Sequence, residues 1–133
     1  MKNEFIPYEE ALALKELGFD EECFGFYDDI DSEHELYQVH TQTWNETHRL
    51  NKQLTRAPLY QQAFRWFREK GIYGEPTSDL SNNLEDRVFV YSLYSETGGY
   101  FVDRSEEYNT YEEAELACLR KLIEIVNQNK EDK

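Results

Sequence analysis

The chain has 133 residues, and its 28 aspartates and glutamates against 14 lysines and arginines give a formal net charge of −14. This length is typical of one domain, so we expect residues 1–133 to form a single domain. The negative charge argues against direct binding of duplex nucleic acid, which needs clustered lysine and arginine. Low hydrophobicity with high charge is typical of disordered chains, but ten tyrosines, eight phenylalanines and two tryptophans predict a folded, aromatic core.

No apolar run approaches the roughly 18 residues needed to span a bilayer, and the first residues lack the apolar segment of a signal peptide. We therefore expect a soluble, cytoplasmic protein with no membrane partner. Its two cysteines, Cys23 and Cys118, form no Cys-x-x-Cys pair, which argues against a zinc or redox site. Both are expected to be buried and unreactive thiols, and the apolar surroundings of Cys118 predict a raised pKa.

Three segments begin with a tyrosine, two glutamate or glutamine residues and an alanine, which is typical of the start of an amphipathic helix. These helices are expected over residues 8–17, 59–70 and 111–127. Gly18 and Gly71 follow the first two helices and predict their ends. Thr110 and Glu113 predict a capping box at the start of the third.

Four aromatic-rich runs predict β-strands, at residues 23–27, 36–40, 88–94 and 100–102. The first two are joined by an acidic segment, which predicts a hairpin with a long polar loop. The run 88–94 is apolar on both faces, so we expect it in the middle of its sheet. Residues 42–57 and 73–86 show little periodicity and are interpreted as long loops.

These elements predict an α+β fold in the order α-β-β-α-β-β-α, with about four strands in one antiparallel sheet and the three helices on it, mainly on one face. The near-equal spacing of the helix starts permits a duplicated helix–hairpin unit. The alternative is that three capped amphipathic helices arose independently, since such a start is common.

Three sequence blocks carry a resemblance to a known family: EALALKELGFDE at residues 10–21, APLYQQAFRWFREK at 57–70 and YEEAELACLRKLIE at 111–124. In these blocks, and in their order and spacing, the chain resembles a family of small uncharacterised proteins of gut bacteroidetes and their phages and prophages. The resemblance implies a context rather than an activity. Small phage-borne proteins are often accessory factors that bind a host protein or a host signalling molecule.

Motifs for metal binding or nucleophilic catalysis are missing from the sequence. His34, His40 and His48 have no helical i, i+4 spacing and no completing ligand. The acidic segment 28–35 has oxygen-bearing side chains at alternate positions but lacks the central glycine and final glutamate of a calcium loop, so a solvated turn is expected. We expect no metal and no cofactor.

The strongest candidate for ligand binding is the aromatic and basic cluster on the predicted second helix. Arg65 and Arg68 lie one turn apart, and Trp66 projects toward the side shared with Gln62 and Lys70, where the indole needs a loop or a partner to cover it. Together they are suited to an anionic, aromatic ligand such as a nucleotide, with Tyr91 or Tyr94 stacking on it from a neighbouring strand. The alternative is structural: Trp66 packs under the long loops and the arginines pair with surface carboxylates.

These observations favour a non-enzymatic phage or prophage accessory protein that binds a host protein or a small anionic ligand. It would either sequester a nucleotide-like host signal or inhibit a host defence protein. A homodimer is expected, because the aromatic content exceeds what a small core hides and closed dimers are the commonest oligomers. The alternatives are a small hydrolase with a carboxylate site that leaves no motif, and a structural virion protein.

Overall fold

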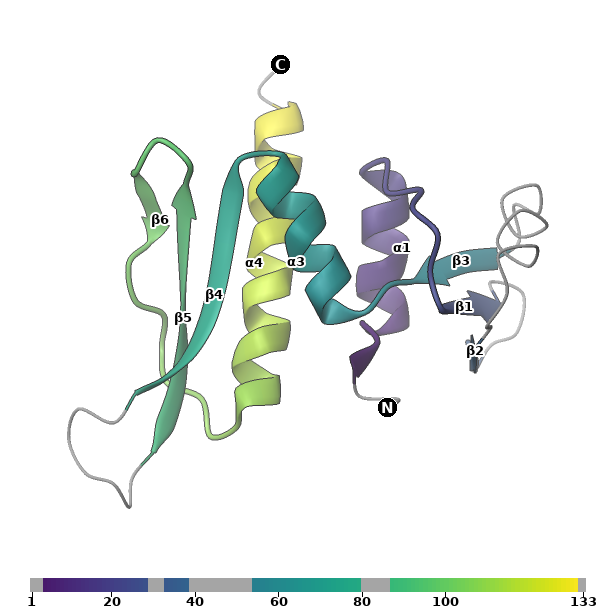
Figure 1. Ribbon diagram of the computed structural model, residues 1–133, viewed down its shortest axis with the longest axis horizontal. Coiled ribbons are helices and arrows are strands. Elements are labelled where there is room, and N and C mark those ends of the chain that lie inside the picture. Colours follow the sequence, from purple (N-terminus) through teal and green to yellow (C-terminus); the bar gives the residue numbers. More distant parts are fainter. Residues whose placement is uncertain (1–3, 29–32, 39–53, 80–86, 132–133) are drawn as a thin grey trace. The chain divides into compact units, whose positions relative to one another are not determined.

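The computed structural model describes residues 4–28, 33–38, 54–79 and 87–131, and over this part of the chain the predicted α+β class is confirmed (Figure 1). The chain divides into two compact units, Met1–Ala63 and Phe64–Lys133. The described elements follow in the order α1 (Tyr8–Glu16), β1 (Gly25–Asp28), β2 (Leu36–Gln38), β3 (Leu54–Ala57), α3 (Tyr60–Glu69), β4 (Ile72–Asp79), β5 (Val88–Ser95), β6 (Tyr100–Val102) and α4 (Tyr111–Glu131).

The first unit combines α1 with a three-stranded antiparallel sheet of order β2-β1-β3. The predicted hairpin is confirmed, because β1 pairs with β2 and Phe26 lies opposite Tyr37. α1 packs on β3. The phenol of Tyr27 donates a buried 2.6 Å hydrogen bond to the carbonyl oxygen of Ile6. This bond ties the start of the chain to the central strand.

The helix ends follow the local signals in the sequence. Gly18 and Gly71 have φ angles of 103° and 87°, in the left-handed region where glycine is favoured, and they confirm the predicted ends of the first two helices. The backbone N–H of Glu113 donates a 3.1 Å hydrogen bond to Oγ1 of Thr110, so the predicted threonine cap is confirmed. α4 continues to Glu131, beyond the end predicted at residue 127.

The prediction of one four-stranded sheet is wrong, because the described residues form two sheets of three strands each. The additional strands, β3 and β4, lie at residues 54–57 and 72–79, largely inside segments that were predicted to be loops. In β3 the three consecutive residues Thr55, Arg56 and Ala57 are all buried, so the strand shows no alternation of apolar and polar residues.

β4 is hidden from sequence analysis by Gly74 and Pro76, two residues that usually argue against a strand. The structure explains both. β4 is an edge strand of the sheet. A proline is tolerated there because the N–H group that it lacks is not needed for a hydrogen bond to a neighbouring strand. Gly74 lies under α4, where a side chain would collide with the helix. Residues 42–53 and 80–86, the remainders of the two predicted loops, lie outside the described residues.

A helix followed by three strands occurs twice in the described chain, but the two sheets are not connected in the same way. In the first unit the strand order is β2-β1-β3, so the first strand of the three is central. In the second unit the order is β4-β5-β6, so the second strand is central. The element order therefore repeats, whereas the topology expected for a duplicated helix–hairpin unit does not.

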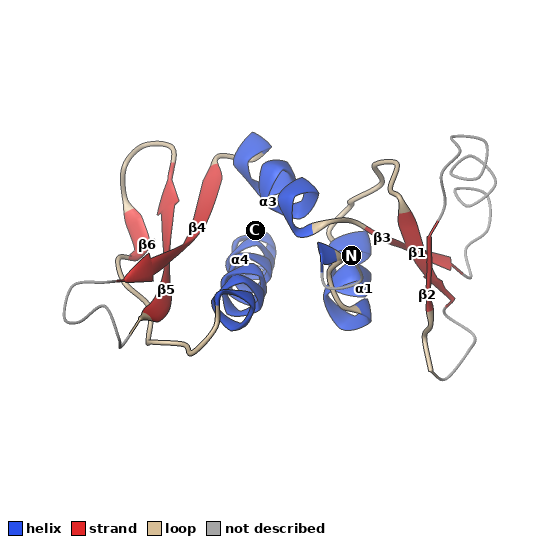
Figure 2. Ribbon diagram, turned by 60° about the horizontal axis from the view of Figure 1, so that its bottom comes forward, coloured by secondary structure: helices blue, strands red, loops and turns tan. Residues whose placement is uncertain are grey.

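The core of the second unit forms where α4 packs on β4 and β5, along one face of the sheet (Figures 1 and 2). The predicted location of residues 88–94 in an inner strand is confirmed, because β5 lies between β4 and β6. Ala114, Cys118, Leu122 and Ile125 on α4 are at most 6% exposed, as the helical pattern predicts. None of the described helices, α4 included, combines the length and the apolar character needed to cross a membrane.

Candidate functional site

The aromatic and basic cluster of α3 is arranged differently from the prediction. Trp66 is only 8% exposed, so its indole is packed in the protein, as in the structural alternative, and is not the exposed aromatic of the ligand-binding hypothesis. Its ring contacts Phe67 edge to face, and Nζ of Lys70 lies 4.4 Å from the ring centroid. The i, i+4 spacing brings Lys70 over Trp66, on the side of the helix where the sequence placed both residues. The indole is therefore part of the packing of the protein.

Arg65 and Arg68 are both exposed on α3, as expected for residues that flank a buried indole. The structure does not bring them to the predicted stacking partners on β5. Among the described residues, α3 makes no extensive contact with β5, and Tyr91 and Tyr94 point to opposite faces of their sheet. The five predicted site residues are thus spread over three separate places, rather than gathered in one site.

The orientation of the sheet follows from Gly74. A Cβ on Gly74 would lie 2.9 Å from Sγ of Cys118 and 2.9 Å from Cδ1 of Leu122, so this position faces α4. Successive residues of a strand point to opposite faces. Tyr73 and Glu75, the neighbours of Gly74, therefore point away from α4.

Three tyrosines lie together on that face, one from each strand of the sheet. The rings of Tyr73 and Tyr94 are stacked, with centroids 5.2 Å apart and an interplanar angle of 6°. The ring centroids of Tyr100 and Tyr94 lie 5.8 Å apart, and Tyr100 is 63% exposed. The phenol of Tyr94 donates a hydrogen bond to the carboxylate of Glu75, which raises the pKa of Tyr94. We name the surface formed by Tyr73, Glu75, Tyr94 and Tyr100 the tyrosine face.

An ion-pair network extends the tyrosine face along the sheet. Arg104 pairs with Asp79 and, at 3.3 Å, with Glu107. The N–H of Ser105, the residue after Arg104, donates to the carbonyl oxygen of Tyr91 from the β6 side of β5. Asp79 belongs to β4, on the other side of β5. The side chain of Arg104 must therefore cross β5, where it is held between two carboxylates.

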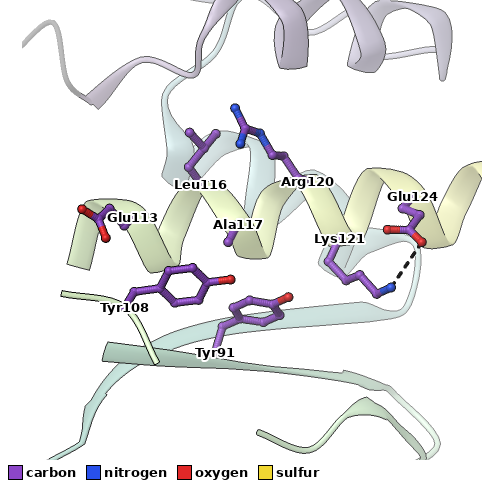
Figure 3. Close-up of a pocket in the computed structure, with 8 residues that line it drawn as sticks. All are labelled: Tyr91, Tyr108, Glu113, Leu116, Ala117, Arg120, Lys121 and Glu124. Carbon is purple, nitrogen blue, oxygen red and sulfur yellow. Dashed lines mark hydrogen bonds and ion pairs between the residues drawn. The ribbon is translucent and has the colours of Figure 1, made fainter. Parts of the chain in front are cut away.

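The opposite face of the sheet carries a groove of about 460 Å³ beside α4 (Figure 3). Tyr91 enters it from β5, and Tyr108 enters it from the segment before α4, with ring centroids 6.3 Å apart. The backbone of Tyr108 is fixed by two hydrogen bonds with Phe89, of 2.8 and 2.9 Å. In Figure 3 Lys121 lies on the side of α4 that faces the two rings, whereas Arg120 points away from them. We name this site the α4 groove; it is lined by Tyr91, Tyr108, Glu113, Leu116, Ala117, Arg120, Lys121 and Glu124.

The α4 groove offers phenol donors and balanced charge. Burial raises the pKa of Tyr91, and burial together with a hydrogen bond to Glu106 raises the pKa of Tyr108 to about 12. Both phenols therefore keep their protons at neutral pH. Nζ of Lys121 lies 3.2 Å from Oε1 of Glu124, which offsets its charge. The groove can hold a flat, partly polar molecule, but it has no excess of positive charge among its lining residues.

Both cysteines are buried and neither forms a disulfide, as predicted. Burial raises the pKa of Cys23 to about 12, and it also raises the pKa of Cys118. A thiol that remains protonated at neutral pH is a poor nucleophile and a poor metal ligand. The two cysteines therefore contribute to packing, as the sequence analysis expected.

The described histidine has a structural environment. The ring of His34 stacks on Tyr8 with centroids 3.7 Å apart, and its Nδ1 lies 3.1 Å from the carbonyl oxygen of Asp28. His40 and His48 lie outside the described residues, as do residues 29–32 of the acidic segment. Within the part of the chain that the structure describes, no three histidine, cysteine or acidic side chains are grouped as a metal site would require.

Most residues of the two surfaces were missed at the level of sequence. Tyr73 lies in a segment interpreted as a loop, and Tyr100 was seen only as part of a short strand. Tyr108 lies in an irregular segment before α4. These tyrosines meet because residues 72–79 pair with residues 88–95, a pairing that no local pattern in the sequence specifies.

Comparisons of the chain with protein-family models, with curated proteins and with solved structures give no match. No relative or structural neighbour therefore assigns a role to the tyrosine face or to the α4 groove. What each surface can bind follows from its own side chains. The first offers aromatic rings beside carboxylates on an open sheet face, and the second offers two phenols in a small groove of mixed charge.

Proposed function

We propose that this protein is a non-enzymatic accessory protein that binds another protein through the tyrosine face. The observation that carries this proposal is the meeting of Tyr73, Tyr94 and Tyr100 on one face of a sheet, turned away from the helix that covers the other face. Tyrosine is enriched at protein interfaces and at their energetic centres. Its ring supplies a large contact area at a low cost in side-chain entropy, and its hydroxyl adds a hydrogen bond.

The rigidity of the tyrosine face supports the same function. Tyr73 and Tyr94 stack on each other, and Tyr94 is also held by its hydrogen bond to Glu75. Side chains that are already fixed in the free protein lose little conformational entropy when a partner binds. The resemblance to phage-borne accessory proteins fits an inhibitor that covers a surface of a host protein, such as a defence protein.

The test is affinity purification with the wild-type protein and two variants as bait, from cells of the host in which the protein is naturally made. Tyr94→Ser combined with Tyr100→Ser is expected to lose the co-purifying protein at least about tenfold, because it removes the centre of the contact. Tyr111→Ser is the matched control, since Tyr111 is also an exposed tyrosine, at 40%, but lies at the start of α4.

Equal recovery of the same protein with wild type and with the double variant would contradict the proposed function. Circular dichroism checks that each variant is folded. If the double variant does not fold, Tyr100→Ser decides alone, because Tyr100 is 63% exposed and its replacement is expected to cost little stability.

The α4 groove favours a second candidate function, the capture of a small ligand of nucleotide type. Its volume of about 460 Å³ and the paired rings of Tyr91 and Tyr108 suit a flat ring system, and Lys121 is the basic side chain directed toward them. Charge in the groove is balanced, which makes this the weaker candidate. Cyclic and linear nucleotides are suitable probes, measured by calorimetry.

A nucleotide that binds in the groove is expected to bind at least about tenfold more weakly to Lys121→Glu, because the charge next to the ligand is reversed. The matched control is Lys70→Glu, a charge reversal directly after the end of α3, outside the residues that line the groove. An equal loss in both variants would indicate a general effect of charge and would remove the groove as the site.

A further inference from the structure

We infer that the partner segment which docks on the tyrosine face is cationic and presents arginine side chains to it. This inference rests on the proposed function and adds the chemistry of the partner. It is drawn from the combination of aromatic rings and carboxylates on one open sheet face, together with the charge of the whole chain.

The rings supply the first half of the recognition chemistry. The faces of tyrosine rings attract cations, and guanidinium groups in particular stack on them. Tyr100 is the most exposed member of the tyrosine face, and Tyr94 lies beside it with its ring tilted by 57° relative to that of Tyr100. The exposed ring of Tyr100 is therefore the ring of this face on which a flat guanidinium group can stack.

The carboxylates supply the second half of the recognition chemistry. Glu75 is exposed and lies within hydrogen-bond reach of the phenol of Tyr94. A cationic side chain that reaches the edge of the Tyr94 ring would therefore meet a carboxylate there, and charge-assisted hydrogen bonds of this type are among the strongest in proteins. On the same sheet face Arg104 pairs with Asp79, so a guanidinium held by a carboxylate already occurs there within the chain.

The overall charge favours a cationic partner over a second copy of the chain. A net charge of −14 attracts basic partners and accelerates their encounter. In a two-fold dimer built on the tyrosine face, the same patch would meet itself and Glu75 would lie close to its own copy. Like charges brought together in an interface are unfavourable. The predicted homodimer, if it forms, would then use another surface.

The experiment uses the full chain and three capped synthetic peptides of equal length, in which glycine alternates with arginine, lysine or glutamate. Binding is followed by NMR titration and by calorimetry. The arginine peptide is expected to bind at least about threefold more tightly than the lysine peptide, because lysine neither stacks nor forms a bidentate pair. The glutamate peptide is expected not to bind. Affinity for the arginine peptide should fall at least about fivefold when the salt concentration rises from about 50 to about 300 mM.

Variants locate the site. Tyr100→Leu and Tyr94→Leu, each measured alone, are expected to weaken binding of the arginine peptide by about five- to tenfold, the first through loss of the exposed ring and the second through loss of the ring that packs beside it. Glu75→Gln is expected to weaken it about fivefold, through loss of the charge at the ring edge. The matched controls are Tyr111→Leu and Glu16→Gln, which change an exposed tyrosine and an exposed glutamate elsewhere on the chain and should leave the affinity within about twofold.

Three results would each overturn the inference: equal binding of the arginine and lysine peptides, equal loss of binding in the controls and in the face variants, or self-association in light scattering that Tyr100→Leu abolishes. The last would assign the surface to a second copy.

Failure of the proposed function is distinguishable from these results. If purification shows a partner that depends on Tyr94 and Tyr100 while the arginine peptide does not bind, the proposed function stands and the arginine inference falls. If the peptide binds but no partner depends on these residues, the proposed function falls.

Discussion

Gly74→Val is expected to lower the free energy of unfolding by about 3 kcal/mol, because the position is filled by neighbouring atoms. A Cβ there would lie 2.9 Å from Sγ of Cys118, 2.9 Å from Cδ1 of Leu122 and 3.0 Å from Cδ2 of Leu93. All three of these side chains have 0% exposure, so they have little room to move aside. Urea denaturation of the wild type and the variant measures the change.

A double-mutant cycle tests whether this contact is the cause. Cys118→Ala removes the sulfur atom nearest to the new side chain, so the double variant Gly74→Val, Cys118→Ala should be less destabilised than the sum of the single variants, by about 1 kcal/mol. Gly99→Val is the matched control, because a Cβ at Gly99 meets nothing closer than 3.7 Å, and its effect should stay within about 0.5 kcal/mol. If the two changes in the free energy of unfolding were strictly additive, the new side chain at position 74 would not be in steric conflict with Cys118.

Stability is expected to fall steeply at alkaline pH, because several buried groups hold their protons more tightly in the folded state. Burial raises the pKa of Cys23 from 9.0 to about 12. A group whose pKa is higher in the folded state contributes fully to stability below the unfolded pKa and loses that contribution as the pH rises toward the folded value. Because of Cys23, the free energy of unfolding should therefore fall by up to about 1.4 kcal/mol for each pH unit above about 9.

Cys118 and the buried Tyr91 should steepen this loss, since burial also raises their pKa values. The measurement is the free energy of unfolding from urea denaturation at several values between about pH 8 and about pH 11. In Cys23→Ala the slope above about pH 9 should be shallower, even though the variant starts from a lower stability. An identical slope in wild type and variant would mean that Cys23 does not remain protonated in the folded protein.

The parts of the fold that were predictable are those in which neighbouring residues carry the signal. The first and third helices begin at Tyr8 and Tyr111 as predicted, and left-handed glycines follow α1 and α3. A helix is closed by hydrogen bonds between residues four apart, and its caps lie within one turn. Short-range patterns are therefore sufficient to locate it.

The parts that were missed depend on residues far apart in the chain. β4 is a strand because Ile72–Asp79 finds a partner in Val88–Ser95, and Pro76 is acceptable there because β4 lies at the edge of the sheet. Nothing local to residues 72–79 contains that information. The burial of Trp66 stayed open between two interpretations for a related reason: its exposure depends on packing, and a sequence pattern shows only which side of the helix it occupies.

The sequence by itself determined the α+β class, the helix boundaries to within a few residues, the central location of β5 and the burial of both cysteines. Only the tertiary structure decided which side chains meet. The sheet brings Tyr73 beside Tyr94, whereas Tyr91 and Tyr94, three residues apart, point to opposite faces. Strand pairing joins distant residues, and the alternation of side chains separates near ones. A binding surface on a sheet is therefore set by register, which local sequence patterns do not specify.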